Sequence, residues 1–262
     1  MDNQKIKTII LCGGMGTRLK EETEFKPKPM VEVGEKPILW HIMKIYSHYG
    51  YNDFIFALGY KGNYIKDYFL KQKYYNCDFS FNQSEGKITN FLKNGEEDNF
   101  NIIFADTGLE TPHGERVIKT RRHIKDDEIF MVTYGDGVSD IDMQKLVEFH
   151  KSHGKIATVT GVHPVSRWGL VNSDENNIVT EFAQKPLLYD YINGGFMVFN
   201  KEFFNYLKPG DMIEDALMRL VPEKQLALYK HQGFWYCMDT YRDFQLLNEF
   251  WEKDPKWKIW SK

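Results

Sequence analysis

The chain has 262 residues, of which 42% are hydrophobic and 27% charged, and its formal net charge is −3. This composition is typical of a globular enzyme with a sizeable core, and the near-neutral charge argues against a dedicated nucleic-acid binder, which is usually basic. No apolar run approaches the roughly 20 residues of a membrane span, and three widely separated cysteines favour a reduced, cytoplasmic protein.

Strand and helix signals alternate along the first 160 residues or so. Short apolar runs predict strands over 8–12, 53–58, 102–105, 129–133 and 157–162. Apolar residues at helical spacing predict helices over 37–50, 64–69, 115–124 and 142–152. The polar segment 82–101 is interpreted as a surface excursion in the form of a β-hairpin. The alternation predicts an α/β fold with a Rossmann-like, mostly parallel central sheet flanked by helices.

The pattern changes near Pro164, where turn signals begin to separate short β segments. These segments predict a small antiparallel β annex. The chain closes on Trp251, Trp257 and Trp260, which we expect to cover a core or a subunit interface rather than a ligand. We interpret residues 1–262 as a single domain, with an α/β body over about 1–160 and a second part with the C-terminal tail over about 161–262.

A glycine-rich loop follows the first predicted strand, in the order Leu-Cys-Gly-Gly-Met-Gly-Thr-Arg over residues 11–18. Glycines let a backbone approach a polyphosphate closely and turn its N–H groups toward the oxygens. The spacing fits neither the ATPase loop nor the dinucleotide fingerprint, in which Leu19 would have to be glycine. Arg18 adds a guanidinium that can bridge phosphates. The alternative interpretation is a glycine-rich surface turn.

Three further charged residues favour a polyphosphate site. Lys28 lies between two prolines that stiffen the backbone, which predicts a second phosphate clamp; a solvated basic turn is the alternative. Asp136 follows a predicted strand, at the sheet edge where open α/β proteins bind ligands. It is a good candidate ligand for Mg²⁺, which takes few carboxylates. Asp239 would complete a carboxylate pair, although alone it could equally cap a helix.

Together these motifs resemble those of the sugar-phosphate nucleotidyltransferases. The matching segments run in order from residue 11 to about 240 and include Lys-Pro-Lys-Pro-Met, Gly-Tyr-Lys-Gly, Thr-Tyr-Gly-Asp-Gly, Ile-Asn-Gly-Gly-Phe and Met-Asp-Thr. Within the family the chain is most similar to members that use CTP and glucose 1-phosphate. The resemblance implies transfer of CMP from CTP to a sugar 1-phosphate, release of pyrophosphate, Mg²⁺ as cofactor and a homo-oligomer.

The resemblance also implies roles for individual residues. Arg18 and Lys28 would stabilise charge at the reacting phosphates, and Asp136 and Asp239 would share the Mg²⁺. The residues that would hold the nucleotide are Leu11, Cys12, Gly13, Gly14, Gly16, Thr17, Thr111 and Arg116. Those that would bind the acceptor are Tyr134, Gly169, Gln184, Lys185, Asn193 and Gly194. The body would then bind the nucleotide and the second part the acceptor.

Departures from the family pattern all fall in the acceptor half. Gln184 stands where Glu is usual, so one charged acceptor of sugar hydroxyls becomes a neutral amide. Trp168 replaces the usual Phe, and the segment Met212-Ile213-Glu214-Asp215 replaces an expected Trp-Glu segment. Nucleotidyl transfer with UTP, dTTP or another phosphorylated acceptor therefore stays open. A non-catalytic nucleotide-binding regulator is a rival of another class, and an NAD-dependent oxidoreductase is a weaker one.

Overall fold

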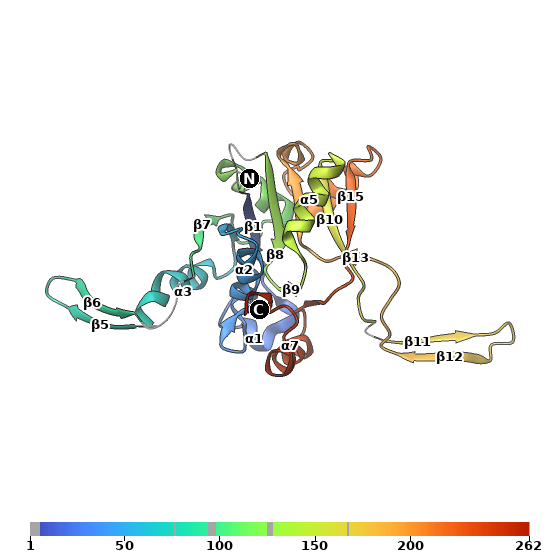
Figure 1. Ribbon diagram of the computed structural model, residues 1–262, viewed down its shortest axis with the longest axis horizontal. Coiled ribbons are helices and arrows are strands. Elements are labelled where there is room, and N and C mark those ends of the chain that lie inside the picture. Colours follow the sequence, from blue (N-terminus) through green and yellow to red (C-terminus); the bar gives the residue numbers. More distant parts are fainter. Residues whose placement is uncertain (1–5, 76, 94–97, 125–127, 167, 262) are drawn as a thin grey trace.

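The protein is described by a computed structural model that covers residues 6–75, 77–93, 98–124, 128–166 and 168–261. Its centre is an eight-stranded sheet in the order β13-β10-β14-β8-β1-β4-β7, with β15 beside β10 (Figure 1). The strands of this sheet are β1 (Lys7–Cys12), β4 (Asp53–Leu58), β7 (Asn101–Asp106), β8 (Ile129–Tyr134), β10 (Ala157–Val162), β13 (Ile192–Asn193), β14 (Met197–Asn200) and β15 (Leu226–Lys230). β13 pairs antiparallel with β10, and β14 pairs antiparallel with β10 and β8. The other pairings in this sheet are parallel, so the predicted mostly parallel sheet is confirmed.

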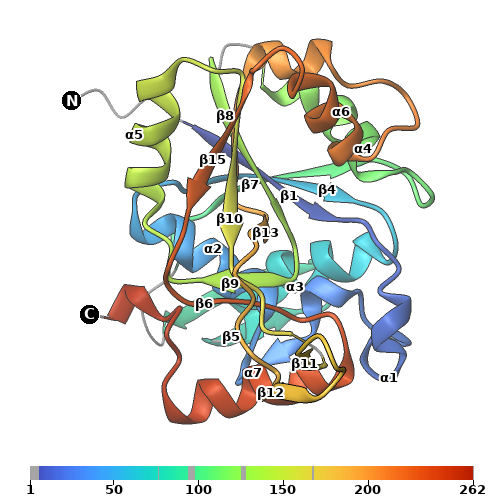
Figure 2. The same ribbon diagram turned by 90° about the vertical axis from the view of Figure 1, so that its right-hand side faces the viewer.

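Helices cover both faces of the sheet. The α-helices are α1 (Lys20–Thr23), α2 (Ile38–His48), α3 (Gly62–Tyr75), α4 (His113–Thr120), α5 (Met143–His153), α6 (Ile213–Leu220) and α7 (Tyr241–Lys253). The 3₁₀ turns are η1 (Thr17–Leu19), η2 (Lys28–Met30), η3 (Arg121–His123), η4 (Lys201–Asn205) and η5 (Ile259–Ser261). In Figure 2, α4 and α6 lie above the sheet, and α2 and α3 lie below it.

The apolar run of β1 shows why this sheet is covered on both sides. Side chains alternate across a strand, so Ile9 and Leu11 pack into the core beneath α4 and α6, while Ile10 and Cys12 pack into the core beneath α2 and α3. A run that is apolar at every position is what a strand buried on both faces requires. None of the helices in the described ranges is both long and apolar enough to cross a bilayer.

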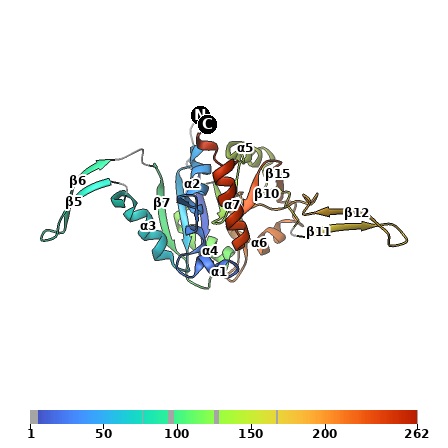
Figure 3. The same cartoon turned by 90° about the horizontal axis from the view of Figure 1, so that it is seen from below.

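Two antiparallel hairpins extend from opposite sides of the body (Figures 1 and 3). The remaining strands are β2 (Glu32–Val33), β3 (Lys36–Pro37), β5 (Cys77–Asn82), β6 (Lys87–Lys93), β9 (Gly137–Ser139), β11 (Gly169–Ser173), β12 (Val179–Gln184) and β16 (Trp235–Cys237). β5 and β6 form the hairpin that was predicted within 82–101, but it begins five residues earlier. Residues 83–86 form its turn, and the Asn82 side chain at the end of β5 accepts hydrogen bonds from the backbone N–H groups of Ser84 and Glu85.

The second hairpin, β11–β12, confirms the predicted small antiparallel annex. The Asp174 side chain forms its tip by accepting hydrogen bonds from the backbone N–H groups of Asn176 and Ile178, both at 2.9 Å. β14 and β15 also follow residue 160, yet both lie in the central sheet. Strands from the second part of the chain therefore belong to the central sheet. Among the described residues of that part, the β11–β12 hairpin is the segment that extends from the body.

The tryptophan-rich tail covers the core. Trp257 is fully buried, and its indole N–H donates to Nδ1 of His41 on α2 at 3.3 Å. The other ring nitrogen of His41, Nε2, donates to the backbone carbonyl of Val33 at 2.9 Å. His41 is therefore a neutral core residue with both ring nitrogens hydrogen-bonded, as expected for a lone histidine on a buried helix face.

Candidate active site

A cavity of about 200 Å³ opens at the carboxyl ends of β1 and β8. It is lined by Leu11, Gly14, Gly16, Thr17, Arg18, Lys28, Pro29, His113, Tyr134, Gly135, Asp136 and Asp239. In an open α/β sheet this edge is where loops from neighbouring strands converge on a ligand. Nine of the residues that the sequence singled out meet here, although they come from four separate stretches of chain.

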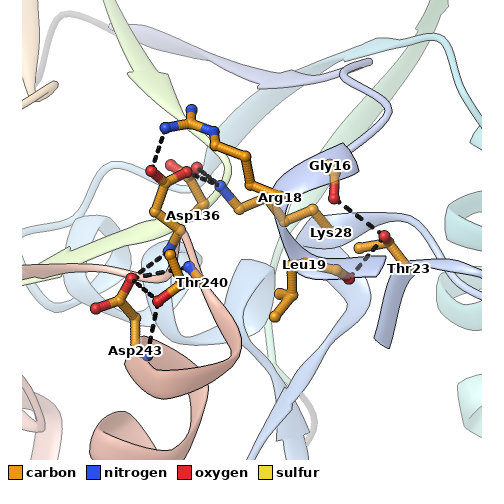
Figure 4. Close-up of polar contacts among 9 residues, drawn as sticks. Gly16, Arg18, Leu19, Thr23, Lys28, Asp136, Thr240 and Asp243 are labelled. Carbon is orange, nitrogen blue, oxygen red and sulfur yellow. Dashed lines mark hydrogen bonds and ion pairs between the residues drawn. The ribbon is translucent and has the colours of Figure 1, made fainter. Parts of the chain in front are cut away.

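Lys28 is the centre of the charged cluster. Its ammonium donates to Asp136 Oδ2 at 2.6 Å and to Asp239 Oδ1 at 3.1 Å, across 108 and 211 positions of sequence (Figure 4). Burial lowers the pKa of Lys28, but the attraction of Asp136 and the hydrogen bond to it more than offset burial, so the pKa lies above its ordinary value. Lys28 is therefore a permanent cation between two carboxylates.

Arg18 completes the cluster through an ion pair with Asp239. The Arg18 side chain is 72% exposed, whereas that of Asp239 is 11% exposed. An ion pair with one exposed partner contributes at most about 1 kcal/mol. Arg18 can therefore exchange this carboxylate for a substrate phosphate at small cost.

A short strand pairing brings the two carboxylates together. β16 runs antiparallel to β9 with Cys237 opposite Gly137, and the N–H of Met238 donates to the Asp136 carbonyl at 2.9 Å. Asp136 precedes β9 and Asp239 follows β16, so this pairing sets them side by side. Asp239 does not cap a helix, which was the alternative interpretation, because Thr240 is the N-cap of α7.

The glycine loop is anchored from below by Thr23. Its hydroxyl lies 3.1 Å from the Gly16 carbonyl and 2.8 Å from the Leu19 carbonyl, and donates toward both (Figure 4). Gly16 has φ +64°, a left-handed conformation that favours glycine, and a Cβ there would lie 3.0 Å from Thr23. Gly14 has no heavy atom within 4 Å of a Cβ position, so its backbone faces open space.

Four residues predicted to hold the nucleotide are not among the lining residues. Cys12 is buried, and burial raises the pKa of its thiol, which fits a small apolar core residue. The Thr111 hydroxyl donates to the Thr107 carbonyl at 2.6 Å. Gly13 and Arg116 contact each other beneath the loop. Direct contacts of these four residues with a nucleotide stay predictions.

The residues predicted to bind the acceptor are divided between the body and the hairpin. Tyr134 lines the cavity, and Asn193 is near it, hydrogen-bonded to the Gly195 N–H. Gly169 and Gln184 are paired where β11 begins and β12 ends, and Lys185 follows with φ +51°. None of these hairpin residues lines the cavity, and Gly194 lies beside it with its carbonyl bonded to Trp235. Their roles stay predictions.

Sequence reasoning missed His113, Pro29 and Gly135 as lining residues. Burial lowers the pKa of His113, opposed by the nearby Glu214 carboxylate, so the ring is neutral at pH 7. Glu214 in turn accepts a hydrogen bond from the Tyr134 hydroxyl at 2.6 Å. The signal for His113 was its place in the 111–116 segment already assigned to the nucleotide.

The carboxylate pair suits a magnesium ion. Asp136 and Asp239 both present oxygens to one cationic group, the Lys28 ammonium, so they converge on a single point at the cavity wall. Mg²⁺ is commonly held by one or two carboxylates together with substrate phosphates and water. Across the described ranges, no group of three or more His, Cys, Asp or Glu side chains could hold a metal. The other ligands would then come from substrate and solvent.

Comparison with known proteins agrees with this geometry. The family model described as Nucleotidyl transferase matches residues 7–254. The chain is 42% identical to the glucose-1-phosphate cytidylyltransferase of Salmonella typhi, over 98% of this chain and 100% of the relative. It is 40% identical to the probable glucose-1-phosphate cytidylyltransferase of Bacillus subtilis, over 97% and 100%.

Solved structures show the same fold. A putative glucose-1-phosphate thymidylyltransferase from Bacillus anthracis, crystallised with a sucrose, superposes with TM-score 0.66 at 21% identity, covering 95% of this chain and 96% of that one. A UDP-glucose pyrophosphorylase complexed with UDP-glucose gives TM-score 0.66 at 15% identity, over 95% and 98%. Since the family model spans almost the whole chain and full-length relatives share two fifths of its residues, the chain belongs to the nucleotidyl transferase family, as a sugar-phosphate nucleotidyltransferase.

Proposed function

We propose that the protein transfers CMP from CTP to a sugar 1-phosphate, with α-D-glucose 1-phosphate as the acceptor, giving a CDP-sugar and pyrophosphate. The observation that carries this proposal is the convergence of Arg18, Lys28, Asp136 and Asp239 with a glycine loop on one cavity. The choice of CTP and glucose 1-phosphate is supported by the names of the relatives at 40% and 42% identity.

The reaction needs charge stabilisation and alignment more than a side-chain base. A phosphate oxygen of the acceptor forms a bond to the α-phosphorus of CTP, while the bond from that phosphorus to the pyrophosphate oxygen breaks. A phosphate monoester is already largely ionised at pH 7, since its second pKa is about 6. Arg18 and Lys28 would stabilise the charge that builds up on the phosphates, and the loop would align the triphosphate.

Asp136 and Asp239 would hold the Mg²⁺ that the family uses. When bound, the ion would reduce the repulsion between two anionic substrates and stabilise the leaving pyrophosphate. The protein's own contribution is to present both carboxylates at one point, through the β9–β16 pairing.

A pyrophosphate-release assay tests the proposal. The purified protein is incubated with Mg²⁺ and CTP, UTP or dTTP, each with glucose 1-phosphate or a panel of other sugar phosphates. We expect the largest kcat/KM for CTP with glucose 1-phosphate. Faster turnover with UTP or dTTP would show that the protein performs the same reaction with that nucleotide as its donor. Binding of CTP without pyrophosphate release from any pair would instead indicate a regulator.

We further propose a homo-oligomer in which the β11–β12 hairpin packs against another copy. A two-stranded hairpin is marginal in water on its own, and large exposed apolar patches commonly mark interfaces. Phe182 and Val171 are cross-strand partners on β11–β12, and both are more than half exposed. Phe182→Ser with Val171→Ser should therefore lower the mass measured by light scattering, whereas Phe25→Ser, which removes an exposed phenylalanine elsewhere, should not. An unchanged mass in the double variant would contradict the proposal.

We also propose a reducing, cytoplasmic setting. Cys12 and Cys237 are both free thiols, as is usual for proteins of reducing compartments.

A further inference from the structure

His231 lies where the chain leaves β15 and turns toward β16. Its backbone N–H donates to the carbonyl of Gly161 on β10 at 2.9 Å. Its side chain is 11% exposed, and Nε2 lies 2.9 Å from Asp140 Oδ1. The same nitrogen lies 3.2 Å from Ser139 Oγ and 3.3 Å from the Phe234 carbonyl. The residue is therefore anchored to the central sheet through its backbone and faces three oxygens through its ring.

The partners of His231 show that Nε2 carries the hydrogen. An ionised Asp140 carboxylate and the Phe234 carbonyl can only accept. The Ser139 hydroxyl donates its hydrogen to the Phe234 carbonyl at 2.7 Å, so toward His231 it accepts as well. The hydrogen-bond network thus assigns Nε2 as a donor, and its bond to Asp140 is charge-assisted.

A glycine two residues further along leaves room for this contact. A Cβ on Gly233 would lie 2.3 Å from Asp140 Oδ1 and 2.8 Å from His231 Cε1. Gly233 does not have a positive φ, so space rather than backbone strain accounts for glycine here. Any larger residue would push Asp140 away from His231.

The contact closes the β9–β16 pairing at the end away from the cavity. The Asp140 N–H donates to the Phe234 carbonyl at 3.2 Å, and the pairing then runs along β9 to Asp136. Four residues of extended chain span about 13 Å, and neither His231 nor Asp140 lines the cavity. His231 can therefore affect the carboxylates through the strands without touching a substrate.

The β9–β16 pairing depends on support from outside. It is a sheet of two strands with three residues of each in register, and an isolated pair of strands is marginally stable in water. We propose that His231 is a positioning residue, which fixes this pairing through Asp140. The pairing in turn holds Asp136 and Asp239 where both can bind one cation, so the inference rests on the proposed Mg²⁺ role of these carboxylates.

The experiment compares three variants with wild type. His231→Leu removes the donor, His231→Gln keeps a side-chain N–H, and Gly233→Ala pushes on Asp140 from outside the cavity. Each is measured for amide hydrogen exchange of residues 136–140 and 234–239, for Mn²⁺ binding by electron paramagnetic resonance, for kcat and KM with CTP, and for thermal stability. Mn²⁺ is the probe because it takes the same carboxylate and water ligands as Mg²⁺.

We expect His231→Leu to speed amide exchange in both segments, because the pairing loses a charge-assisted hydrogen bond. Mn²⁺ binding should weaken and kcat should fall, each by about tenfold, since groups that orient metal ligands have effects of that size. KM for CTP should stay within about threefold of wild type, because the glycine loop is untouched. His231→Gln should recover most of the loss, and Gly233→Ala should lie between wild type and His231→Leu.

His150→Leu is the matched control. His150 on α5 is also buried, and its ring nitrogens lie 2.8 Å from Thr158 Oγ1 and 3.0 Å from Asn200 Oδ1, near the start of β10. This variant should lower thermal stability, while Mn²⁺ binding and amide exchange of residues 136–140 and 234–239 stay as in wild type.

Four outcomes would overturn the inference. In the first, His231→Leu speeds exchange while Mn²⁺ binding and kcat stay intact, which would be a purely structural role. In the second, His231→Gln loses as much as His231→Leu. In the third, His231→Leu does not fold and Gly233→Ala binds Mn²⁺ normally. In the fourth, wild type binds no Mn²⁺, which would also reject the metal assignment. If wild type binds Mn²⁺ but releases no pyrophosphate, the proposed function fails, yet Mn²⁺ binding still decides the role of His231.

Discussion

At the residue scale, the candidate site contains opposite charges that neutralise one another. Lys28 lies between Asp136 and Asp239, and Arg18 pairs with Asp239 from the solvent side. Two cations and two carboxylates balance, so the cluster adds nothing to the net charge of −3. A near-neutral chain can therefore contain a polyphosphate site without any sign of it in its overall composition.

Removing one carboxylate should stop turnover without unfolding the protein. Asp136→Asn or Asp239→Asn keeps the shape but removes the charge that would hold Mg²⁺, so we expect kcat to fall by at least about 100-fold. Asp67→Asn, a surface carboxylate paired with Lys71 on α3, is the matched control and should stay within about twofold. Circular dichroism should show folded protein throughout, and wild-type-like turnover in either site variant would reject the metal assignment.

Lys185→Ala tests whether the base of the β11–β12 hairpin serves the acceptor. Loss of a charge-assisted contact to the acceptor phosphate should raise the acceptor KM by about tenfold and leave the KM for CTP unchanged. Lys224→Ala is a close control, because Lys224 is exposed and also has a positive φ, +54° against +51°. If Lys185→Ala and Lys224→Ala change the acceptor KM equally, the effect comes from the backbone and the acceptor role of Lys185 is wrong.

At the element scale, the start of α7 sets the position of Asp239. Thr240 Oγ1 accepts from the Asp243 N–H at 3.3 Å, and Asp243 Oδ2 accepts from the Thr240 N–H at 2.8 Å. The Asp239 N–H also donates to Asp243 at 3.2 Å. This capping box therefore fixes both the helix and the backbone of Asp239, the predicted Mg²⁺ ligand.

Thr240→Ala should show this coupling. Losing an N-cap hydroxyl costs about 1 kcal/mol of unfolding free energy, measurable by urea denaturation, and kcat should fall because Asp239 loses its fixed backbone. Thr240→Ser keeps the cap oxygen and should restore both quantities. A stability loss with unchanged kcat would show that the cap serves α7 alone.

At the scale of the whole molecule, buried histidines limit stability in acid. Burial lowers the pKa of His41 to about 4 from its ordinary 6.5, and burial lowers that of His150 to about 4 as well. The folded protein keeps both rings neutral, while the unfolded chain takes up protons below about pH 6.5. Stability should therefore be lost as the pH falls from about 6.5 toward 4, by an amount of about 3 kcal/mol for His41 alone.

His41→Gln tests this pH dependence. Glutamine has no proton to gain in this range, so the drop in unfolding free energy between pH 7.5 and pH 5 should be smaller in His41→Gln than in wild type, even if the variant is less stable at both pH values. Urea denaturation at the two pH values measures it, and an equal drop in both proteins would exclude His41 as a cause.

The sequence by itself determined the fold class, and it singled out the strand edge and the four charged residues that the structure brings together at one cavity. These rest on local patterns: apolar runs, helical periods and glycines next to a strand end. Its less accurate expectations also have a local cause. The β5–β6 hairpin was predicted to begin at residue 82 but begins at Cys77, because polar residues in a hairpin tip resemble those of any surface segment.

Only the tertiary structure decided which distant residues meet. Lys28 reaches Asp239 across 211 positions because β16 pairs with β9, and no local pattern encodes that pairing. The same holds for β14 and β15, which join the central sheet from the second half of the chain. Only the tertiary structure also shows that Arg116 donates to the Gly13 carbonyl, and its predicted contact with the nucleotide stays a prediction. Charge and propensity are properties of single residues, whereas burial and contact are properties of the folded chain.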